Sequence, residues 1–225
     1  MTAPDLARDG LTVSVVGGTG AQGRGLARRF ASAGLSVVIG SRNADRAHEA
    51  ALAVATATGG CVSGSANEAA ARAGDIVILA VPWTGHRELL CQLAEALAGK
   101  IVVSCVNPLG FDKYGAFALP VEEGSAAQQA SALLPKSRVV AAFHHVSAAQ
   151  LDDPTIDSMA LDVLVLGEDG EAVELVQSLV GALPGMRGVY GGRLRNAHQV
   201  EALTANLISI NRRYKVHSGL RVTEL

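Results

Sequence analysis

The sequence of 225 residues contains only three cysteines, Cys61, Cys91 and Cys105, and none of them has the spacing of a metal site. An odd number of cysteines without paired spacing does not predict a disulfide framework. We therefore expect reduced thiols that pack as small hydrophobic side chains, as in a cytoplasmic protein. We also expect no bound metal ion.

Long apolar runs and a leader sequence are also missing. Apolar runs such as 76–83 and 161–166 are far shorter than the roughly 20 residues that a membrane-spanning helix needs. The first ten residues carry Asp5, Arg8 and Asp9 and contain no apolar core of a signal peptide. The sequence therefore predicts buried strands where it is apolar, and no membrane partner.

Charged residues make up only 18% of the chain, hydrophobic residues make up 49%, and the net charge is -2. This balance supports a sizeable core and argues against disorder. Residues 186–225 are basic, because only Glu201 and Glu224 oppose seven lysines and arginines there. Such an end can attract an anionic partner, or it can form a solvated face or a subunit contact. Without a basic low-complexity arm, we expect no nucleic-acid partner.

Short apolar strands alternate with helical patterns along the chain. This order predicts right-handed crossovers and an α/β protein with a Rossmann-type, doubly wound, mostly parallel sheet. Residues 1–150 should form the Rossmann domain, and residues 151–225 a small C-terminal α/β extension. The expected strands are 11–16, 35–40, 61–63, 75–81, 101–106, 139–143 and 161–166, and the expected helices are 22–33, 44–58 (capped by Asn43), 67–72, 84–98, 171–183 and 197–213.

Residues 109–125 contain three glycines and separate two predicted elements. We expect a long loop there, and loops of this length in compact domains often serve function. Whether this loop closes over a site is left open by the sequence.

The first predicted strand and helix are joined by a glycine-rich turn, Gly18-Thr19-Gly20-Ala21-Gln22-Gly23. It matches the G-x-G-x-x-G fingerprint in the strand-to-helix context that a dinucleotide site requires. Gly18 should permit the tight turn, Gly20 should let the backbone approach a pyrophosphate, and Gly23 should allow close helix packing. The helix N-terminus would supply free N–H groups and positive partial charge. The alternative is a glycine-rich turn without a ligand.

No acidic residue follows the second predicted strand until Asp45. An NAD-preferring site usually has Asp or Glu there, which bonds the ribose 2′-hydroxyl. Ser41 and Arg42 can instead donate hydrogen bonds to a 2′-phosphate, and Arg46 one turn later adds positive charge. These residues predict NADP as the cofactor of the domain 1–150. The alternative is that both arginines are ordinary surface residues.

Ligands of open α/β sheets lie at the carboxyl ends of the strands. Three segments follow predicted strand ends and supply candidate pocket residues: Val81-Pro82-Trp83, Val106-Asn107-Pro108 and His144-His145-Val146-Ser147-Ala148. Neighbouring residues on a strand point to opposite faces, so His144 and His145 should not share a metal ion. Trp83 could cover the cofactor or fill the core.

Catalytic motifs are scarce at these strand ends. The sequence shows no Gly-x-Ser-x-Gly elbow, no Ser-x-x-x-Lys or Tyr-x-x-x-Lys pair suited to carbonyl reduction, and no P-loop. His145 and Ser147 are the candidate catalytic residues, either as proton donors or as the wall of a pocket, and no essential acid or base is expected. This shortage favours direct hydride transfer between two bound cofactors, where proximity and orientation dominate.

Several segments in the same order share the pattern of one family: Val15-Val16-Gly17-Gly18-Thr19-Gly20-x-x-Gly23-x-Gly25-Leu26-Ala27, Val38-x-Gly40-Ser41-Arg42, Val81-Pro82-Trp83, Phe143-His144-x-Val146-x-Ala148-Ala149, Gly192-x-Leu194-x-Asn196, Val200-Glu201-x-Leu203-Thr204 and Leu207-Ile208-x-Ile210. Through them nearly the whole chain resembles the NADP oxidoreductases that use coenzyme F-420 (also written F420), an 8-hydroxy-5-deazaflavin.

The resemblance implies reversible hydride transfer between reduced coenzyme F-420 and NADP, with small-molecule cofactors as the partners. Val146 and Ala148 would lie near the nicotinamide, with the deazaflavin stacked against it. Residues 151–225 would complete the second-substrate pocket and form a homodimer contact. The residues around the adenine and phosphates would be Thr19, Ala21, Gln22, Ser41, Arg42 and Arg46.

Two other functions remain open at this point. One is an NADP-dependent reductase of another acceptor, such as a flavin, a quinone, an imine or a metal chelate. The other is a non-catalytic redox sensor that binds NADP(H), because a Rossmann fold does not fix function.

Overall fold

The computed structural model describes residues 6 and 10–225 of the chain. The prediction that the chain has no leader sequence concerns residues 1–10, and nearly all of these lie outside the described residues. The strands are β1 (Thr12–Val16), β2 (Ser36–Ser41), β3 (Val62–Ala66), β4 (Ile76–Leu79), β5 (Ile101–Ser104), β6 (Leu109–Asp112), β7 (Gly115–Ala118), β8 (Arg138–Ala141), β9 (Leu161–Gly167) and β10 (Met186–Gly192). The helices are α2 (Ala21–Ser32), α3 (Ala44–Thr58), α4 (Asn67–Ala73), α5 (His86–Leu93), α6 (Ala126–Leu133), α7 (Ala148–Asp152), α8 (Gly170–Gly181), the 3-10 turn η1 (Leu194–Asn196) and α9 (Ala197–Tyr214).

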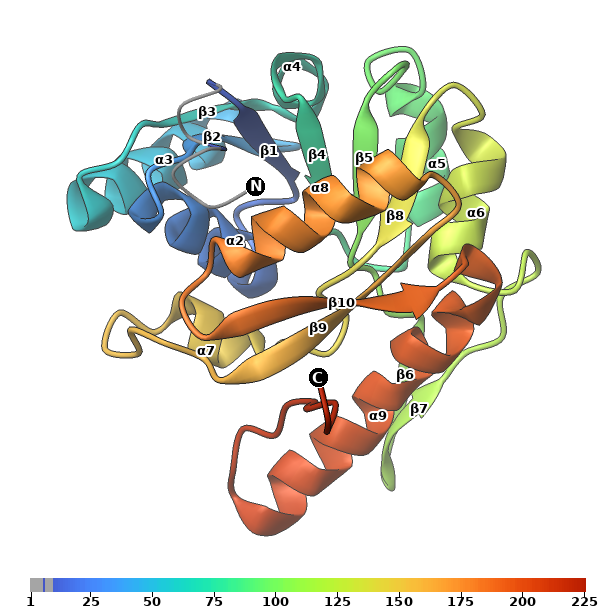
Figure 1. Cartoon of the computed structure of the whole chain (residues 1–225). Coiled ribbons are helices and arrows are strands. Elements are labelled where there is room, and N and C mark those ends of the chain that lie inside the picture. The colour runs from blue at the N-terminus through green and yellow to red at the C-terminus, as the bar shows by residue number, and fades with distance from the viewer. Residues whose placement is uncertain (1–5, 7–9) are drawn as a thin grey trace.

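Eight strands form one sheet in the order β10-β9-β8-β5-β4-β1-β2-β3 (Figure 1). Neighbouring strands run parallel except β8 and β9, where Val140 lies opposite Gly167 in antiparallel pairing. The predicted doubly wound, mostly parallel sheet is therefore confirmed. Strands β9 and β10, which belong to residues 151–225, extend the same sheet, and the domain boundary at residue 150 stays a prediction.

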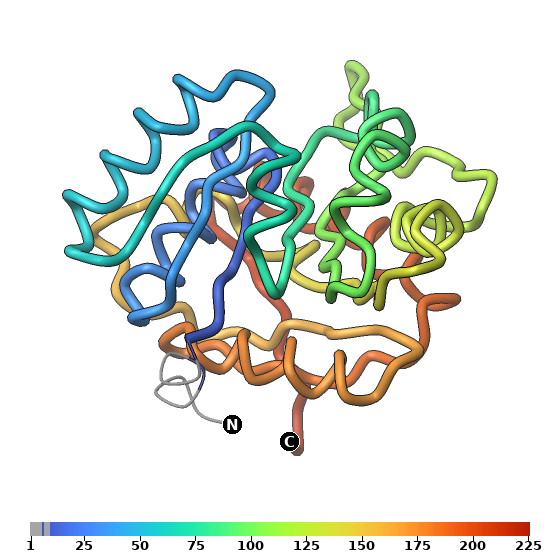
Figure 2. The backbone as a smooth tube through the Cα atoms, turned by 90° about the horizontal axis from the view of Figure 1, so that it is seen from above, coloured from blue at the N-terminus to red at the C-terminus, as the bar shows by residue number. Residues whose placement is uncertain are grey.

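Helices cover both faces of the sheet and enclose two apolar clusters. One cluster contains side chains of α2, α3 and α8, and the other contains side chains of α4, α5, α6 and α9. Figure 2 shows α8 on the opposite side of the sheet from α5 and α6. Strand residues alternate between the clusters: Ile76 and Ile78 face the first, and Val77 and Leu79 face the second. Burial on both faces explains the continuous apolar runs of these strands.

The central strands are shorter than the sequence predicts. The expected strands 75–81, 101–106 and 139–143 pair only as far as Leu79, Ser104 and Ala141. The apolar residues that follow leave the ladder, so apolarity alone overestimates strand length. The helix capped by Asn43 is confirmed, because its side chain accepts a hydrogen bond of 3.1 Å from the N–H of Arg46.

Two expected elements were wrong. The predicted helix 84–98 is helical only over α5, because Gly85 takes a left-handed conformation (φ 82°) before it and the chain turns after Leu93. The predicted loop 109–125 contains the hairpin β6–β7. The carboxylate of Asp112 accepts hydrogen bonds from the N–H groups of Tyr114 and Gly115 and stabilises this turn.

Elements α6, α7 and β10 were not predicted from the sequence. None of the described helices has both the length and the apolarity that a membrane span needs.

Glu201 on α9 is a buried carboxyl group that joins α9 to α6. Its oxygens accept hydrogen bonds from the N–H groups of Ala126 (2.9 Å) and Ala127 (3.0 Å), at the N-terminus of α6. Burial raises the pKa of Glu201 to about 7, although the two N–H donors act in the opposite direction. The folded protein therefore holds this proton more tightly than the unfolded chain, whose pKa lies near 4.5. Its contribution to stability is complete below about pH 4.5 and is lost as the pH rises to about 7.

We expect Glu201→Gln to remove this titration, because an amide still offers an oxygen acceptor but carries no charge. Between pH 5 and pH 8 the free energy of unfolding of the wild type should therefore fall relative to that of Glu201→Gln. Urea unfolding at a series of pH values measures both. Glu88→Gln, on the exposed part of α5, is the control and should follow the wild type. Parallel pH dependence of Glu201→Gln and wild type would contradict this interpretation.

Candidate functional site

The turn between β1 and α2 depends on glycine at two adjacent positions. Gly17 has a positive φ of 78°, and a Cβ there would lie 2.5 Å from the carbonyl oxygen of Ala80. The left-handed residue of the turn is therefore Gly17 and not Gly18. Gly18 is required for a different reason: its Cβ would lie 2.8 Å from the carbonyl oxygen of Val15. The turn therefore lies directly on the strand end.

The next two glycines have opposite surroundings. A Cβ on Gly23 would lie 2.7 Å from both the oxygen of Gly17 and the Cα of Gly18, so α2 packs closely on the turn. A Cβ on Gly20 would meet nothing nearer than the oxygen of Gly17 at 3.6 Å, so the space beside Gly20 is open. Within the described residues, no acceptor binds the N–H groups at the start of α2, which belong to Ala21, Gln22 and Gly23. This arrangement suits an anion.

The cationic pair lies beside this turn, at the end of β2. The N–H of Gly18 donates to the oxygen of Gly40 over 2.9 Å, which ties the glycine turn to the residues before Ser41. Arg42 and Arg46 are exposed, and among the described carboxylates none pairs with either guanidinium. Both arginines are therefore available for an anionic group bound next to the turn.

A cavity of about 350 Å³ lies past the ends of β5 and β8, on the other side of the start of α2. Seven residues that the sequence predicts as site or pocket residues line this cavity: Gln22, Asn107, His144, His145, Val146, Ser147 and Ala148. It does not bring Val81, Pro82 and Trp83 into this cavity. Val81 lies against the glycine turn, since its Cγ1 would be 2.7 Å from a Cβ on Gly17. Trp83 is half-buried and packs on the ring of His86, with 5.4 Å between the ring centroids.

The two adjacent histidines follow β8 in a turn, so the expectation that they point to opposite faces of a strand was wrong. Phe143, just before them, has a positive φ of 64°, which is strained for a non-glycine residue. Hydrogen bonds fix this turn: the oxygen of Phe143 accepts from Gln22 (3.2 Å), and the oxygen of His144 accepts from Asn107 (2.8 Å) and Thr204 (3.0 Å). The strained turn is thus held by α2, by α9 and by the connection between β5 and β6.

Both imidazoles are buried and uncharged near neutral pH. Burial lowers the pKa of His144 to about 3 and the pKa of His145 to about 4. Nε2 of His145 lies 3.3 Å from the N–H of Leu164 and accepts from it, which assigns the proton of the neutral ring to Nδ1. That Nδ1 and the Oδ1 of Asn107 are buried without a partner among the described residues. Both residues line the cavity, but these two atoms are themselves closed off from solvent.

Several cavity residues were missed by the sequence interpretation. Four of them share one face of α9, at the helical spacing i, i+3, i+4 and i+7: Thr204, Leu207, Ile208 and Asn211. Apolar residues at helical spacing in this helix (Val200, Leu203, Leu207 and Ile210) suggest a single buried face, but Ile210 is 39% exposed. Because the polar Thr204 and Asn211 alternate with apolar residues, the hydrophobic pattern alone did not reveal this face. The other missed residues are Cys105, Leu109 and Ser218.

The segment after α9 returns to the sheet, where Asp162 binds it through a hydrogen bond. This fully buried carboxylate accepts from Arg187 (2.8 and 2.9 Å) and from the N–H of Val222 (2.7 Å). The Arg187 guanidinium holds the pKa of Asp162 at about 2. Ser218, on the same segment, bonds to Asn211 and lines the cavity.

Among the described residues no group of three potential ligands gathers for a metal ion.

An anion-binding turn on a doubly wound sheet, with a cavity at the strand ends, places the protein in the class of Rossmann-type dinucleotide-binding proteins. Residues 12–108 match the family model described as "NADP oxidoreductase coenzyme F420-dependent". The chain is 35% identical to the F420-dependent NADP reductase of Methanothermobacter thermautotrophicus over 96% of both chains. It is 37% identical to the F420-dependent NADP reductase of Methanocaldococcus jannaschii, over 96% of this chain and 99% of the relative.

The chain belongs to the F420-dependent NADP reductase family. This confirms the resemblance seen in the sequence. A crystal structure of a protein from Arthrobacter sp. FB24 has the same fold, with a TM-score of 0.79 and 26% sequence identity. The match covers 96% of this chain and 100% of that one.

Proposed function

We propose that this protein transfers a hydride between reduced coenzyme F-420 and NADP, in either direction. The observation that carries the proposal is the uncharged cavity beside an anion-binding glycine turn. The two relatives from Methanothermobacter and Methanocaldococcus are F420-dependent NADP reductases and match 96% of the chain, which supports the same pair of coenzymes here.

The residues around the glycine turn fit NADP. The open space at Gly20 suits a pyrophosphate, as do the N–H groups of Ala21, Gln22 and Gly23, which have no acceptor within residues 6 and 10–225. Arg42 and Arg46 are exposed and unpaired among the described carboxylates, as a 2′-phosphate site requires. We therefore assign the adenosine half of NADP to the end of β2.

The cavity fits a deazaflavin ring. The pyrimidinedione edge of such a ring presents an N–H donor between two carbonyl acceptors. Polar side chains that line the cavity, among them Asn107, Ser147 and Asn211, can pair with these groups. A volume of about 350 Å³ lies at the lower end of the range of small-molecule pockets. Val146, Ser147 and Ala148 would then lie beside the place where this ring stacks against the nicotinamide.

When they are bound, the two coenzymes supply the hydride donor and the hydride acceptor. The protein orients their rings, and the neutral His144 and His145 exclude charge from the space between them. Proximity and orientation of this kind lower a barrier without an acid or base. His145 and Ser147 therefore act as pocket residues in this proposal.

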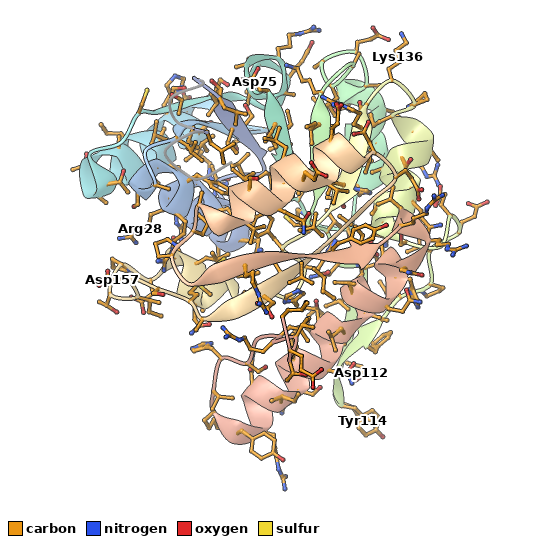
Figure 3. The ribbon with its side chains drawn as sticks, in the orientation of Figure 1. Arg28, Asp75, Asp112, Tyr114, Lys136 and Asp157 are labelled. Atoms are coloured by element: carbon orange, nitrogen blue, oxygen red, sulfur yellow. The ribbon has the colours of Figure 1, made fainter. Side chains whose placement is uncertain are left out.

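Residues 151–225 are proposed to complete the second-substrate pocket, and α9 supports this because it supplies one wall of the cavity. We also propose that the protein forms a homodimer. Large apolar side chains near the hairpin and the end of α9 support this contact, since Tyr114 is 83% exposed and Phe111 and Tyr214 are each 70% exposed. Figure 3 shows Tyr114 pointing away from the molecule at the tip of the hairpin. The cytoplasmic location expected from the sequence stays a prediction.

A panel of acceptors tests the proposal. NADPH is mixed anaerobically with the protein and, separately, with oxidised coenzyme F-420, FMN, a quinone, an imine and a ferric chelate. We expect loss of the deazaflavin absorbance and turnover at least ten times faster than with any other acceptor. Faster turnover with another acceptor would favour the other reductase function. Tight NADPH binding without turnover of any acceptor would favour a redox sensor.

A further inference from the structure

The helix that begins at the glycine turn, α2, also touches the short helix α7, and the two lie side by side in Figure 1. Gly25 makes this close approach possible. A Cβ at Gly25 would lie 2.6 Å from the Cβ of Leu151 and 2.9 Å from the backbone nitrogen of Asp152. The two backbones therefore meet without an intervening side chain.

Helix α7 has only five residues and depends on other parts of the chain. A helix of this length is not stable alone, and its last carbonyl groups have no partner within the helix. Arg29 of α2 supplies those partners. Its Nε donates to the oxygen of Leu151 over 3.0 Å, and its Nη2 donates to the oxygens of Gln150 (2.7 Å) and Asp153 (3.3 Å). Its Nη1 donates to the oxygen of Ile156.

Two neighbouring arginines add to the same contact. Arg28 donates to the oxygen of Asp152 over 2.9 Å. Figure 3 labels Arg28 and Asp157 on this side of the molecule, where α2 meets the loop that follows α7. Arg24 forms an ion pair with the carboxylate of Asp152, with 3.0 Å between Nε and Oδ1, and also approaches the oxygen of Thr19 in the glycine turn at 3.5 Å.

The other end of α7 lies at the cavity. Ser147 caps the helix, because its Oγ accepts from the N–H of Gln150 over 3.4 Å, and Val146, Ser147 and Ala148 line the cavity. Any shift of α7 would therefore move these three residues relative to the glycine turn. The distance between the glycine turn and the cavity wall is therefore fixed by three arginines of α2: Arg24, Arg28 and Arg29.

We propose that Arg29 is a positioning residue for hydride transfer, which holds α7 and thereby the cavity wall Val146–Ala148 in register with the glycine turn. This inference rests on the proposed function. Arg29 is only 9% exposed, and within the described residues it contacts carbonyl oxygens and no carboxylate. A planar guanidinium can donate to several carbonyls at once, whereas a lysine ammonium is a single compact point of charge. Arginine, and not positive charge alone, is what this position requires.

The test compares the wild type with Arg29→Lys. We expect amide hydrogen exchange of residues 147–156 in the ligand-free protein to become at least tenfold faster, with little change at the β1–α2 turn. At saturating NADPH and coenzyme F-420, kcat should fall by about tenfold to a hundredfold, because displacement of the cavity wall by about 1 Å is enough for such a loss. The affinity for NADPH, measured by direct titration, should change by less than about threefold, because the glycine turn itself is intact.

Two further variants separate positioning from general destabilisation. Leu93→Ala removes buried volume on α5, remote from α7, and lowers the melting temperature without touching the cavity wall. Its kcat at a temperature where it is fully folded should equal that of the wild type. If Arg29→Lys does not fold, Asp152→Asn replaces it, because that variant weakens the ion pair with Arg24 on the partly exposed side of α7. It should lower kcat by about twofold to fivefold with unchanged NADPH affinity.

Each outcome decides the proposal. Faster exchange in 147–156 together with a lower kcat and unchanged NADPH affinity supports it. A folded Arg29→Lys with wild-type kcat, a loss confined to NADPH affinity, or an equal loss of kcat in Leu93→Ala would overturn it, as would wild-type kcat in Asp152→Asn. A wild type that binds NADPH but reduces no coenzyme F-420 would overturn the proposed function, and with it the role in hydride transfer. The exchange data of that protein would still show whether Arg29 holds α7.

Discussion

Replacement of Arg42 by alanine should weaken the binding of NADP(H) by several-fold to about a hundredfold and leave the binding of NAD(H) nearly unchanged. A hydrogen bond from a charged group contributes on the order of 1–3 kcal/mol, which corresponds to that range. The loss should be selective, because Arg42 lies at the end of β2, where the 2′-phosphate is expected, and outside the glycine turn. The side chain is exposed and has no carboxylate partner among the described residues, so folding should be unaffected.

Titration of the protein with NADPH and with NADH, followed by fluorescence or calorimetry, measures both affinities for wild type and Arg42→Ala. Arg72→Ala is a matched control, since Arg72 is also an exposed arginine on the described surface but pairs with Glu68 on α4. It should change neither affinity. An equal loss for both dinucleotides in Arg42→Ala would remove the assignment of the 2′-phosphate.

Replacement of Gly20 by alanine should weaken the binding of both NADP(H) and NAD(H) by at least about tenfold, or about 1.4 kcal/mol. The free protein tolerates this methyl group, because Gly20 has an ordinary φ of -77° and the nearest atom to its Cβ lies 3.6 Å away. The methyl group would instead occupy the space through which a pyrophosphate reaches the start of α2. The effect should therefore appear in binding and not in folding.

Gly23→Ala is the matched comparison in the same turn. Its Cβ would lie 2.7 Å from two backbone atoms of the turn, so the free protein must distort. We expect Gly23→Ala to lower the melting temperature of the free protein and Gly20→Ala to leave it within about 2 °C, which corresponds to less than about 1 kcal/mol for a chain of this size. Thermal unfolding with and without NADPH measures both. A Gly20→Ala variant that binds both dinucleotides like the wild type would contradict the placement of the pyrophosphate.

Much of the fold could be predicted because the repeating strand-helix pattern reports burial directly. The helix at 44–58 agreed to the residue, since Asn43 marks its start and Gly59, left-handed at φ 68°, marks its end. Helix α7 could not be predicted, because it exists through hydrogen bonds from α2, more than 100 positions away in the sequence. The hairpin β6–β7 was missed for a similar reason: its strands of four residues are too short to show a period.

The candidate site divides in the same way. The glycine turn could be predicted because a local backbone requirement selects glycine, although the left-handed residue is Gly17 and not Gly18. The cavity wall on α9 could not, since Thr204 and Asn211 become pocket residues only through the packing of α9 beside the β8 turn. The buried neutral state of His144 and His145 also depends on tertiary packing. A sequence motif reflects the backbone and side-chain requirements of one local segment. The pocket cannot be predicted in this way, because it is formed by segments that are distant in the sequence.

Transfer of an isotopic label from NADPH to the deazaflavin tests the central claim most directly. NADPH carrying deuterium on either face of C4 is mixed with the protein and oxidised coenzyme F-420 in ordinary water, and the reduced deazaflavin is analysed by mass spectrometry. If the two rings meet in the cavity beside Val146 and Ala148, one of the two labelled forms should deliver its deuterium to the product almost completely. A product reduced without label from either form, or no reduction at all with ample protein, would contradict direct hydride transfer at this site.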